Sequence, residues 1–417
     1  MESTILIYVS EKNERIRYLF SFIFEQILGI SIQITDSKEF FLQSTHAKFS
    51  YSHEPIGKIN FRPTNLLFET EINLQNIDNL NNDPFALCFY LISCYEEYLP
   101  FTKDRHGRFS YQASSMKKKL NLTEPYIDNF TFSLFEELKK TFPFLVKKER
   151  KFQFINTIDI DHAWLYKNKD LWINAGSLIK KIVKFRWKLA VLQVKILLNQ
   201  KDDPYFIYPY ILSLPFPTTF FISFGKNGKF DTNHNPSNKK YRGLIKNLQK
   251  NPKAKLGLHP SYRSNSDIKI LQEEKSNLEN LLGENVFRSR QHFIKVNFPK
   301  TYKNLLNLSI KEDFSMGFQD FAGFRAGTCT PFYWFDLEEN KITDLKIYPF
   351  CMMDVTLKNY MQLSEKEAEN TVSALIDSVK KVNGTFISIF HNDSLSDFSE
   401  WKGWKLLYDK LIAKIND

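Results

Sequence analysis

The chain of 417 residues lacks a cysteine framework, a long apolar run and the pattern of a signal peptide. Its four cysteines include no CxxC pair, so we expect free thiols in a reducing compartment rather than disulfides. No run of about 18 uncharged apolar residues occurs, and no membrane-spanning helix is therefore predicted. The first residues, Met1–Val9, have no basic region before a long apolar run and instead predict a β-strand. We therefore expect a cytoplasmic protein.

Motifs that recognise nucleic acid are also absent. The sequence has no zinc-finger spacing, no RNA-binding aromatic signature and no arginine-rich tail, so nucleic acid is not expected as a partner. It has 57 Lys and Arg against 47 Asp and Glu, a formal charge of +10 that favours anionic partners. Hydrophobic residues make up 43% and charged residues 25%, as in ordinary globular proteins.

The N-terminal part has the pattern of a small α/β domain. Ile16–Phe24 predicts a helix after the first strand, and Ile30–Thr35 predicts a second strand. Further along, Asp83–Leu99 predicts a helix that is capped at its start and has a strongly apolar face. The charged run Lys147–Lys151 indicates a surface connection. We therefore expect residues 1–147 to form a smaller N-terminal α/β domain, whose role the sequence does not indicate.

Residues 148–417 alternate short apolar strands with helical stretches, and ionisable residues follow several of the strands. In a β/α barrel, the carboxyl ends of the strands surround the active site. The pattern therefore predicts an α/β fold for this domain, a (β/α) barrel that is distorted or incomplete. The expected strands are Phe152–Ile158, Thr218–Ser223, Lys255–Leu258, Phe287–His292 and Gly384–Phe390.

A basic helical insertion, at about residues 171–202, interrupts this alternation. Residues 171–200 predict a long helical stretch that is basic on one side. Such a stretch could lie peripherally on an anionic membrane surface, cover the active site as a lid, or pack on the barrel as an ordinary amphipathic insertion. Its basic residues are Lys180, Lys181, Lys184, Arg186, Lys188 and Lys195.

The strongest local signal for chemistry is a pair of carboxylates, Asp159 and Asp161, directly after an apolar strand. In an extended strand, residues two apart point to the same side, so both carboxylates can face one site. One can bind a divalent cation while the other acts as a base. Alone the signal is weak, because such pairs also cap helices and line turns.

Three histidines and an arginine occupy comparable positions. His259 follows an expected strand, and His292 is a second candidate nitrogen ligand close to Arg290. Arg325 lies between glycines that would let it approach an acid closely, and His391 ends an apolar strand where it could act as a general acid. Finding several such residues at strand ends is much less expected by chance than finding one.

These motifs resemble those of the polysaccharide deacetylase family, carbohydrate esterase family 4, and most of all a divergent bacterial branch with an extra N-terminal domain. The resemblance covers roughly the last two-thirds of the chain. Asp159-Ile160-Asp161 is similar to the family's first motif, in which one Asp is the base and the other binds metal. His259 is similar to the first histidine of the second motif, Arg325 to the arginine that orients the base, and His391 to the general acid.

The resemblance implies a hydrolase of a C–N amide bond, a carbohydrate N-deacetylase that uses a divalent metal, with zinc as the default. The family's second histidine falls at Arg263 in this chain, and an arginine cannot replace a neutral imidazole as a ligand. His292 is therefore expected to join Asp161 and His259 as a metal ligand, with Asp159 as the base. The residues expected to contact the sugar are Trp164, Tyr262, Arg290, Phe332 and Tyr333.

The expected substrate is an N-acetylated sugar of a surface polysaccharide or glycoconjugate pathway. A cytoplasmic enzyme would act on a nucleotide-linked or lipid-linked saccharide, at the inner face of the membrane if the insertion lies on it. One alternative is a non-catalytic saccharide-binding or scaffold protein on the same fold. A second is a glycoside hydrolase that uses Asp159 and Asp161, although carboxyls two residues apart rarely straddle a glycosidic bond.

Overall fold

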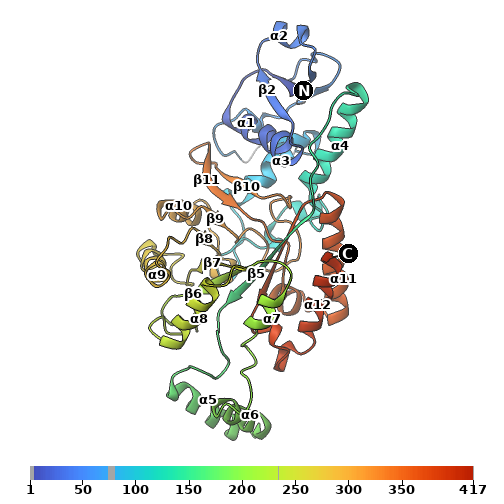
Figure 1. Ribbon diagram of the computed structural model, residues 1–417. Helices are drawn as coiled ribbons and strands as arrows, with labels where there is room; N and C mark the ends of the chain where they lie inside the picture. Colours follow the sequence, from blue (N-terminus) through green and yellow to red (C-terminus); the bar gives the residue numbers. More distant parts are fainter. Residues whose placement is uncertain (1–3, 74–79, 233, 417) are drawn as a thin grey trace. The chain divides into compact units, whose positions relative to one another are not determined.

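The computed structural model describes residues 4–73, 80–232 and 234–416, which divide into two compact units (Figure 1). Unit 1 holds the described residues up to Phe154, together with Val296–Cys351 and Ala374–Phe386. Unit 2 holds Ile155–Lys295, Met352–Ser373 and the described residues from Ile387 onward. None of the helices in the described ranges combines the length and apolar composition that a bilayer span requires.

Unit 1 contains a parallel sheet with the strand order β2-β1-β3-β4. Strand β1 pairs on both sides, with Ile5 opposite Ile32 and also opposite Ala47, and it is buried along nearly its whole length. The β-α-β beginning expected from the sequence is thus present. The strands are β1 (Thr4–Val9), β2 (Ser31–Thr35), β3 (Ala47–Tyr51), β4 (Asn60–Phe61), β9 (Glu312–Asp313), β10 (Phe332–Asp336) and β11 (Lys341–Ile347).

The helices of unit 1 follow local sequence signals closely. Asp83 caps α3 by accepting hydrogen bonds from the backbone N–H groups of Phe85 and Ala86. The helix ends at Ile92 rather than at Leu99, because Cys94 adopts a left-handed conformation with φ of 52°. The helices are α1 (Glu14–Phe20), α2 (Lys38–Gln43), α3 (Pro84–Ile92), α4 (Tyr126–Thr141) and α10 (Lys300–Asn307), and a π-helical stretch, Ser21–Ile27, continues α1.

Unit 2 is built on a parallel sheet with the strand order β8-β7-β6-β5-β13-β12. Strand β6 (Thr218–Ser223) is buried at every residue, as expected for a central strand that is covered on both faces. Its other strands are β7 (Ala254–His259), β8 (Arg288–Ser289) and β12 (Met352–Met353), and its helices are α5 (Leu171–Val183), α6 (Trp187–Leu197), α7 (Tyr208–Ser213), α8 (Lys239–Gln249), α9 (Ile268–Leu282) and α12 (Trp404–Asn416). Three elements have residues in both units: β5 (Gln153–Ile160), α11 (Glu365–Lys381) and β13 (Thr385–His391).

The mixed α/β class with parallel-rich sheets is confirmed. Closure into a barrel is not: no pairing among the described strands of unit 2 joins β12 back to β8, so the barrel stays a prediction. The expected boundary at residue 147 lies near the end of the first segment of unit 1, but residues 296–351 and 374–386 group with that unit as well. The expected long helix at 171–200 is a pair, α5 and α6, separated where Phe185 takes a left-handed φ of 54°.

Candidate metal centre

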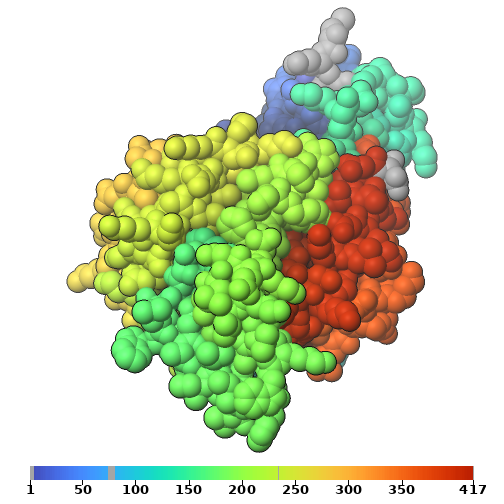
Figure 2. Space-filling model, turned by 60° about the horizontal axis from the view of Figure 1, so that its bottom comes forward, coloured from blue at the N-terminus to red at the C-terminus, as the bar shows by residue number. Residues whose placement is uncertain are grey.

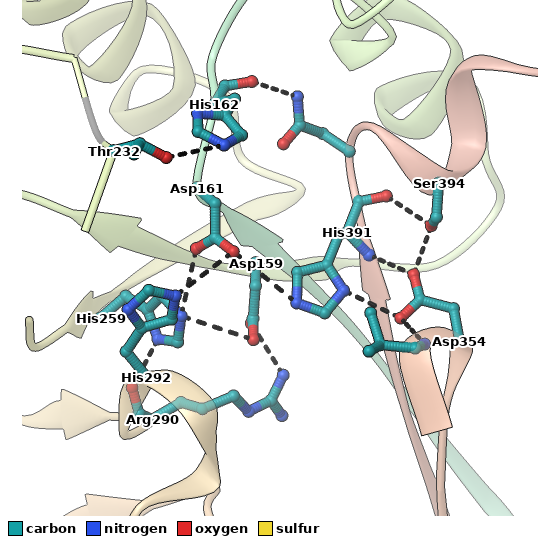
Figure 3. A network of polar contacts seen from close by, with 12 residues as sticks. Asp159, Asp161, His162, Thr232, His259, Arg290, His292, Asp354, His391 and Ser394 are labelled. Carbon is teal, nitrogen blue, oxygen red and sulfur yellow. Dashed lines mark hydrogen bonds and ion pairs between the residues drawn. The ribbon is translucent and has the colours of Figure 1, made fainter. Parts of the chain in front are cut away.

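Polar side chains gather where the strands of unit 2 end (Figure 3). Asp159 lies near the end of β5 and Asp161 follows that strand, while His259 and His391 are the last residues of β7 and β13. The parallel register aligns these ends, since Ser223 of β6 pairs with His259. His292 follows the short strand β8. The carboxyl ends of parallel strands thus form one ionisable cluster.

Asp161, His259 and His292 form a group that could hold a metal ion. One ligand atom from each lies within 4.8 Å of the other two. The Nε2 atom of His259 is 3.3 Å from Oδ1 of Asp161, and Nε2 of His292 is 3.6 Å from Oδ2 of the same carboxylate. Two imidazole nitrogens and one carboxylate are a typical ligand set for zinc, and three protein ligands leave room for water or substrate.

The orientation of His259 is fixed by the backbone. Its Nδ1 atom lies 2.6 Å from the carbonyl oxygen of Arg290. A carbonyl only accepts, so Nδ1 carries the proton and donates it, which leaves the lone pair on Nε2. Nε2 of His259 and Oδ1 of Asp161 are both buried without a hydrogen-bond partner. A cation between these two atoms would satisfy both, so the residues present fit a metal ion.

His292 is held in the same way by a carboxylate. Its Nδ1 atom lies 2.9 Å from Oδ1 of the buried Asp231, which also accepts a hydrogen bond from the backbone N–H of Tyr262 at 2.8 Å. Burial by itself lowers the pKa of His292, but Asp161 and Asp231 outweigh burial and raise it to about 9. The negative charge that stabilises this proton also favours a cation, and a carboxylate behind a ligating imidazole is typical of zinc sites.

Asp159 is a buried carboxylate beside an arginine. Nη1 of Arg290 lies 2.9 Å from Oδ1 of Asp159, and Oδ2 of Asp159 lies 3.9 Å from Nε2 of His259. The guanidinium of Arg290 lies over the ring of Phe221, 4.5 Å from its centre. Gly257 makes room for that ring, because a Cβ atom at this position would lie 2.7 Å from it. Two neighbouring strands therefore place the arginine against Asp159.

His391 lies on the side of Asp161 opposite to His259 and His292, and it is paired with Asp354 (Figure 3). Its Nδ1 atom is 2.8 Å from Oδ1 of Asp354, and its Nε2 atom is 3.9 Å from Oδ2 of Asp161. Asp354 is buried and also accepts hydrogen bonds from the hydroxyl of Ser394 and the backbone N–H of His391. Burial lowers the pKa of His391, but Asp354 and then Asp161 raise it well above its ordinary value. His391 is therefore arranged to hold a proton.

Arg325 has a different partner from the one expected. In unit 1 its Nε atom donates to Oε1 of the buried Glu97 at 2.8 Å, and Nη1 donates to the carbonyl oxygen of Gly317 at 3.1 Å. The guanidinium beside Asp159 is that of Arg290, which the sequence pointed to only as a substrate contact. The glycines around Arg325 indicated a close approach to an acid, and that acid is Glu97. Which arginine meets Asp159 depends instead on strand register, which places Arg290 beside it.

The expected sugar-binding residues are divided between the two units. In unit 2, the ring of Trp164 stacks on Phe206 and is almost entirely buried, while Tyr262 lies under the ammonium of Lys295 at 4.0 Å. In unit 1, Phe332 is buried against Phe22, with ring centres 6.2 Å apart, and Tyr333 is partly exposed. Trp164 and Phe332 thus have packing partners that account for them without a ligand.

Sequence reasoning missed two carboxylates, Asp231 and Asp354. Asp354 follows the short buried strand β12, and an apolar run ending in an acid was the signal that could have revealed it. Asp231 lies in the connection between β6 and α8, where no periodic pattern marks it. Both act on a histidine that is far from them in the sequence, at separations of 61 and 37 residues.

Comparison with known proteins gives limited matches. Residues 5–143 match the model of a family described as "Family of unknown function (DUF7033)", and no curated protein matches the chain. A proposed polysaccharide deacetylase from Mycobacterium smegmatis is similar in structure, with a TM-score of 0.40 and 13% identity over 64% of this chain and 85% of that one. A 4-alpha-glucanotransferase from Thermococcus litoralis has a TM-score of 0.37 and 12% identity over 64% of this chain and 38% of that one. Likenesses at these TM-scores do not assign a family or an activity.

Proposed function

We propose that this protein is a metal-dependent hydrolase that removes the acetyl group from an N-acetylated sugar of a surface polysaccharide or glycoconjugate. The observation that carries the proposal is the combination of three convergent ligand atoms with two oriented proton-transfer groups. Asp161, His259 and His292 supply the ligands, while Asp159 and His391 lie beside them. Amide hydrolysis needs these parts: an electrophilic centre, a base for water and an acid for the leaving amine.

Asp161, His259 and His292 would hold the cation, with zinc as the expected ion for this ligand set. When bound, a divalent cation supplies a Lewis acid that polarises the acyl oxygen. Arg290 and Asp231 keep the two imidazoles in the tautomer that directs Nε2 toward Asp161. The chain's own hydrogen bonds therefore prepare the ligand geometry in advance.

Asp159 is the proposed base. It takes a proton from water as the water oxygen bonds to the acyl carbon, and the guanidinium of Arg290, at 2.9 Å, orients the carboxylate. His391 is the proposed acid, and Asp354 keeps it protonated. It gives its proton to the nitrogen as the C–N bond breaks, so that acetate and a free amino sugar are formed.

The proposed substrate is a saccharide carried on a nucleotide or a lipid. Its phosphate groups would be attracted by a chain whose formal charge is +10. Arg290, an expected sugar contact, is bonded instead to Asp159 and, through its carbonyl oxygen, to His259. Tyr262 remains a proposed sugar contact, and its backbone N–H donates to the Asp231 that holds His292. Trp164, Phe332 and Tyr333 stay proposals that substitution can test.

Metal content and product analysis test the proposal together. His259→Ala and His292→Ala should lose the bound zinc that the unaltered protein retains after purification, whereas His234→Gln, a change to a buried histidine of unit 2 outside the ligand group, should keep it. The unaltered protein should release acetate from a UDP-linked N-acetylhexosamine or from N-acetylated oligosaccharides. Zinc that stays bound in both ligand variants refutes the metal centre. Zinc binding with no acetate from any substrate would instead favour a saccharide-binding protein, and a new reducing end would favour a glycoside hydrolase.

A further inference from the structure

The two helices α5 and α6 form a hairpin, Leu171–Leu197 (Figure 1). Hydrogen-bonded polar side chains join the two helices. Gln193 is fully buried, and its Nε2 atom donates to the carbonyl oxygen of Asn174 at 2.9 Å. Nζ of Lys181 donates to Oε1 of Gln193 at 2.7 Å and to the hydroxyl of Ser177 at 2.6 Å. Hydrogen bonds among amide, hydroxyl and ammonium groups thus hold the hairpin together, with Ile196 as a buried apolar residue.

The large apolar side chains of this hairpin point away from its polar interior. Trp172 is 88% exposed, Leu171 84% and Phe185 80%. An arrangement with polar groups inside and aromatic rings outside is the reverse of what water favours. Such an exposed apolar surface is typical of a site that binds a partner or a membrane. The other exposed apolar residues are Ile173, Ile179, Ile182, Val183, Trp187, Val191, Val194 and Leu197, and Leu198 directly after the hairpin is exposed as well.

The charge of the same segment has one sign. No Asp or Glu occurs from Leu171 to Lys201. The exposed basic residues stand among the exposed apolar ones and can extend their charged ends past them. They are Lys180, Lys184, Arg186, Lys188, Lys195 and Lys201. Figure 2 shows this segment (green) on the surface of the protein.

We propose that the α5–α6 hairpin docks on the surface of a lipid bilayer that contains anionic lipids. Tryptophan, phenylalanine and leucine side chains enter the boundary between headgroups and acyl chains, while lysine and arginine bind the anionic headgroups. The helices have 13 and 11 residues, which gives lengths of about 20 Å and 16 Å. Since the hydrocarbon core is about 30 Å thick, the helices lie in the interface and do not cross it.

Charge distinguishes this occupant from a second copy of the chain. In a symmetric dimer the same surface meets itself, so the lysines of one hairpin would face those of the other. With no carboxylate in the segment to pair with them, that contact would be repulsive. An anionic bilayer complements both the apolar and the cationic parts of the surface.

The base of the hairpin is fastened to the part of unit 2 that carries the metal centre. Asp203 accepts hydrogen bonds from the backbone N–H groups of Leu165 and Tyr166, both at 2.8 Å, and closes the insertion. Asn392, the neighbour of His391, donates to the carbonyl oxygen of His162 at 2.8 Å and to that of Tyr205 at 3.1 Å. Docking of the hairpin would therefore hold the metal centre near the membrane surface. The docking proposal itself does not depend on the proposed function.

Co-sedimentation with vesicles tests the docking. The full chain should bind vesicles of equimolar phosphatidylcholine and phosphatidylglycerol, and bind phosphatidylcholine vesicles much more weakly. Lys184→Gln with Lys188→Gln should weaken binding to the anionic vesicles about 25-fold, at about fivefold for each charge. Trp172→Ser with Phe185→Ser should also weaken it. Phe144→Ser with Leu406→Ser, a matched pair of exposed apolar residues outside the hairpin, should not.

Three results with vesicles would each overturn the proposal: no binding of the unaltered chain to anionic vesicles, equal loss of binding in the matched control, or unchanged binding in both hairpin variants. Thermal unfolding of each variant shows that it is folded, so a loss of binding cannot be ascribed to misfolding. Sedimentation velocity without lipid identifies the competing occupant. A dimer of the unaltered chain that the Trp172→Ser, Phe185→Ser variant converts to a monomer would assign the surface to a second copy instead.

Discussion

Replacing Asp231 by asparagine should weaken metal binding without removing a ligand. The carboxylate accepts from Nδ1 of His292 at 2.9 Å and from the backbone N–H of Tyr262 at 2.8 Å. Asparagine can accept the same hydrogen bonds through its carbonyl oxygen, so the loop keeps its anchor. The negative charge behind the imidazole is lost, and His292 becomes a poorer electron donor to a cation.

The expected size of the effect follows from the change in that hydrogen bond. A hydrogen bond to a charged group contributes about 1.5 to 3 kcal/mol, against about 0.5 to 1.5 kcal/mol between neutral groups. The difference of about 1 to 1.5 kcal/mol corresponds to about a tenfold loss of zinc affinity. This lies at the lower end of the 10-fold to 100-fold range, roughly, that such supporting groups contribute. Asp231→Ala, which removes the acceptor as well, should lose about 100-fold.

Competition with a chelator of known zinc affinity, at one fixed pH, measures these changes. Asp203→Asn is the matched control, because Asp203 is also buried in unit 2 and also accepts backbone hydrogen bonds, at 2.8 Å from Leu165 and Tyr166. Its zinc affinity should stay at the level of the unaltered protein. An Asp231→Asn variant that binds zinc as tightly as the control would falsify the view that Asp231 supports a ligand.

Three further predictions concern the acid, the expected base-orienting arginine and the metal. Burial lowers the pKa of His391, but Asp354 raises it, so activity that needs the His391 proton persists at neutral pH and is lost as pH rises through that pKa. Asp354→Asn should therefore shift the basic limb of the kcat/KM profile to lower pH. A basic limb that does not move would contradict the assignment of His391 as the acid. Arg325→Met leaves Glu97 buried and unpaired, so urea denaturation should show a free energy of unfolding lower by about 3 to 5 kcal/mol, with zinc content unchanged. Adding Glu97→Leu should restore most of that stability. A variant that keeps full stability but loses activity would refute the structural role of Arg325. Zinc at about 100 times its Kd should add about 2.7 kcal/mol to the free energy of unfolding, measured as a rise in Tm, and Asp161→Asn should show a smaller rise; an equal rise would place the zinc elsewhere.

Much of the candidate site could be located from the sequence, because its residues carry a local signal. Asp159, Asp161, His259 and His391 each end or follow an apolar run that forms a buried strand. Alternation of strands and helices makes such strands parallel, and parallel strands bring their carboxyl ends to one edge. The structure places these four residues in one cluster with His292.

The hairpin shows what a helical pattern leaves open. The basic residues of 171–200 indicated an amphipathic helical segment, which is a statement about periodicity. Whether its apolar side chains pack against the protein or face outward depends on the neighbours of the helix. In the structure Gln193 and Asn174 lie inside and Trp172 lies outside.

The sequence by itself determined the α/β class, the strands β5, β6, β7 and β13 of unit 2 and the residue types at their ends, whereas the expected strand Phe287–His292 is only the short β8 and β12 was not expected. Only the tertiary structure decided which arginine meets Asp159 and which carboxylates hold the histidines. Arg290 reaches Asp159 across 131 residues and Asp231 reaches His292 across 61. Periodicity and turn signals report on neighbours within a few residues, whereas these contacts depend on strand register and loop path. For that reason Arg325, which resembled the expected arginine in sequence, is paired with Glu97 instead.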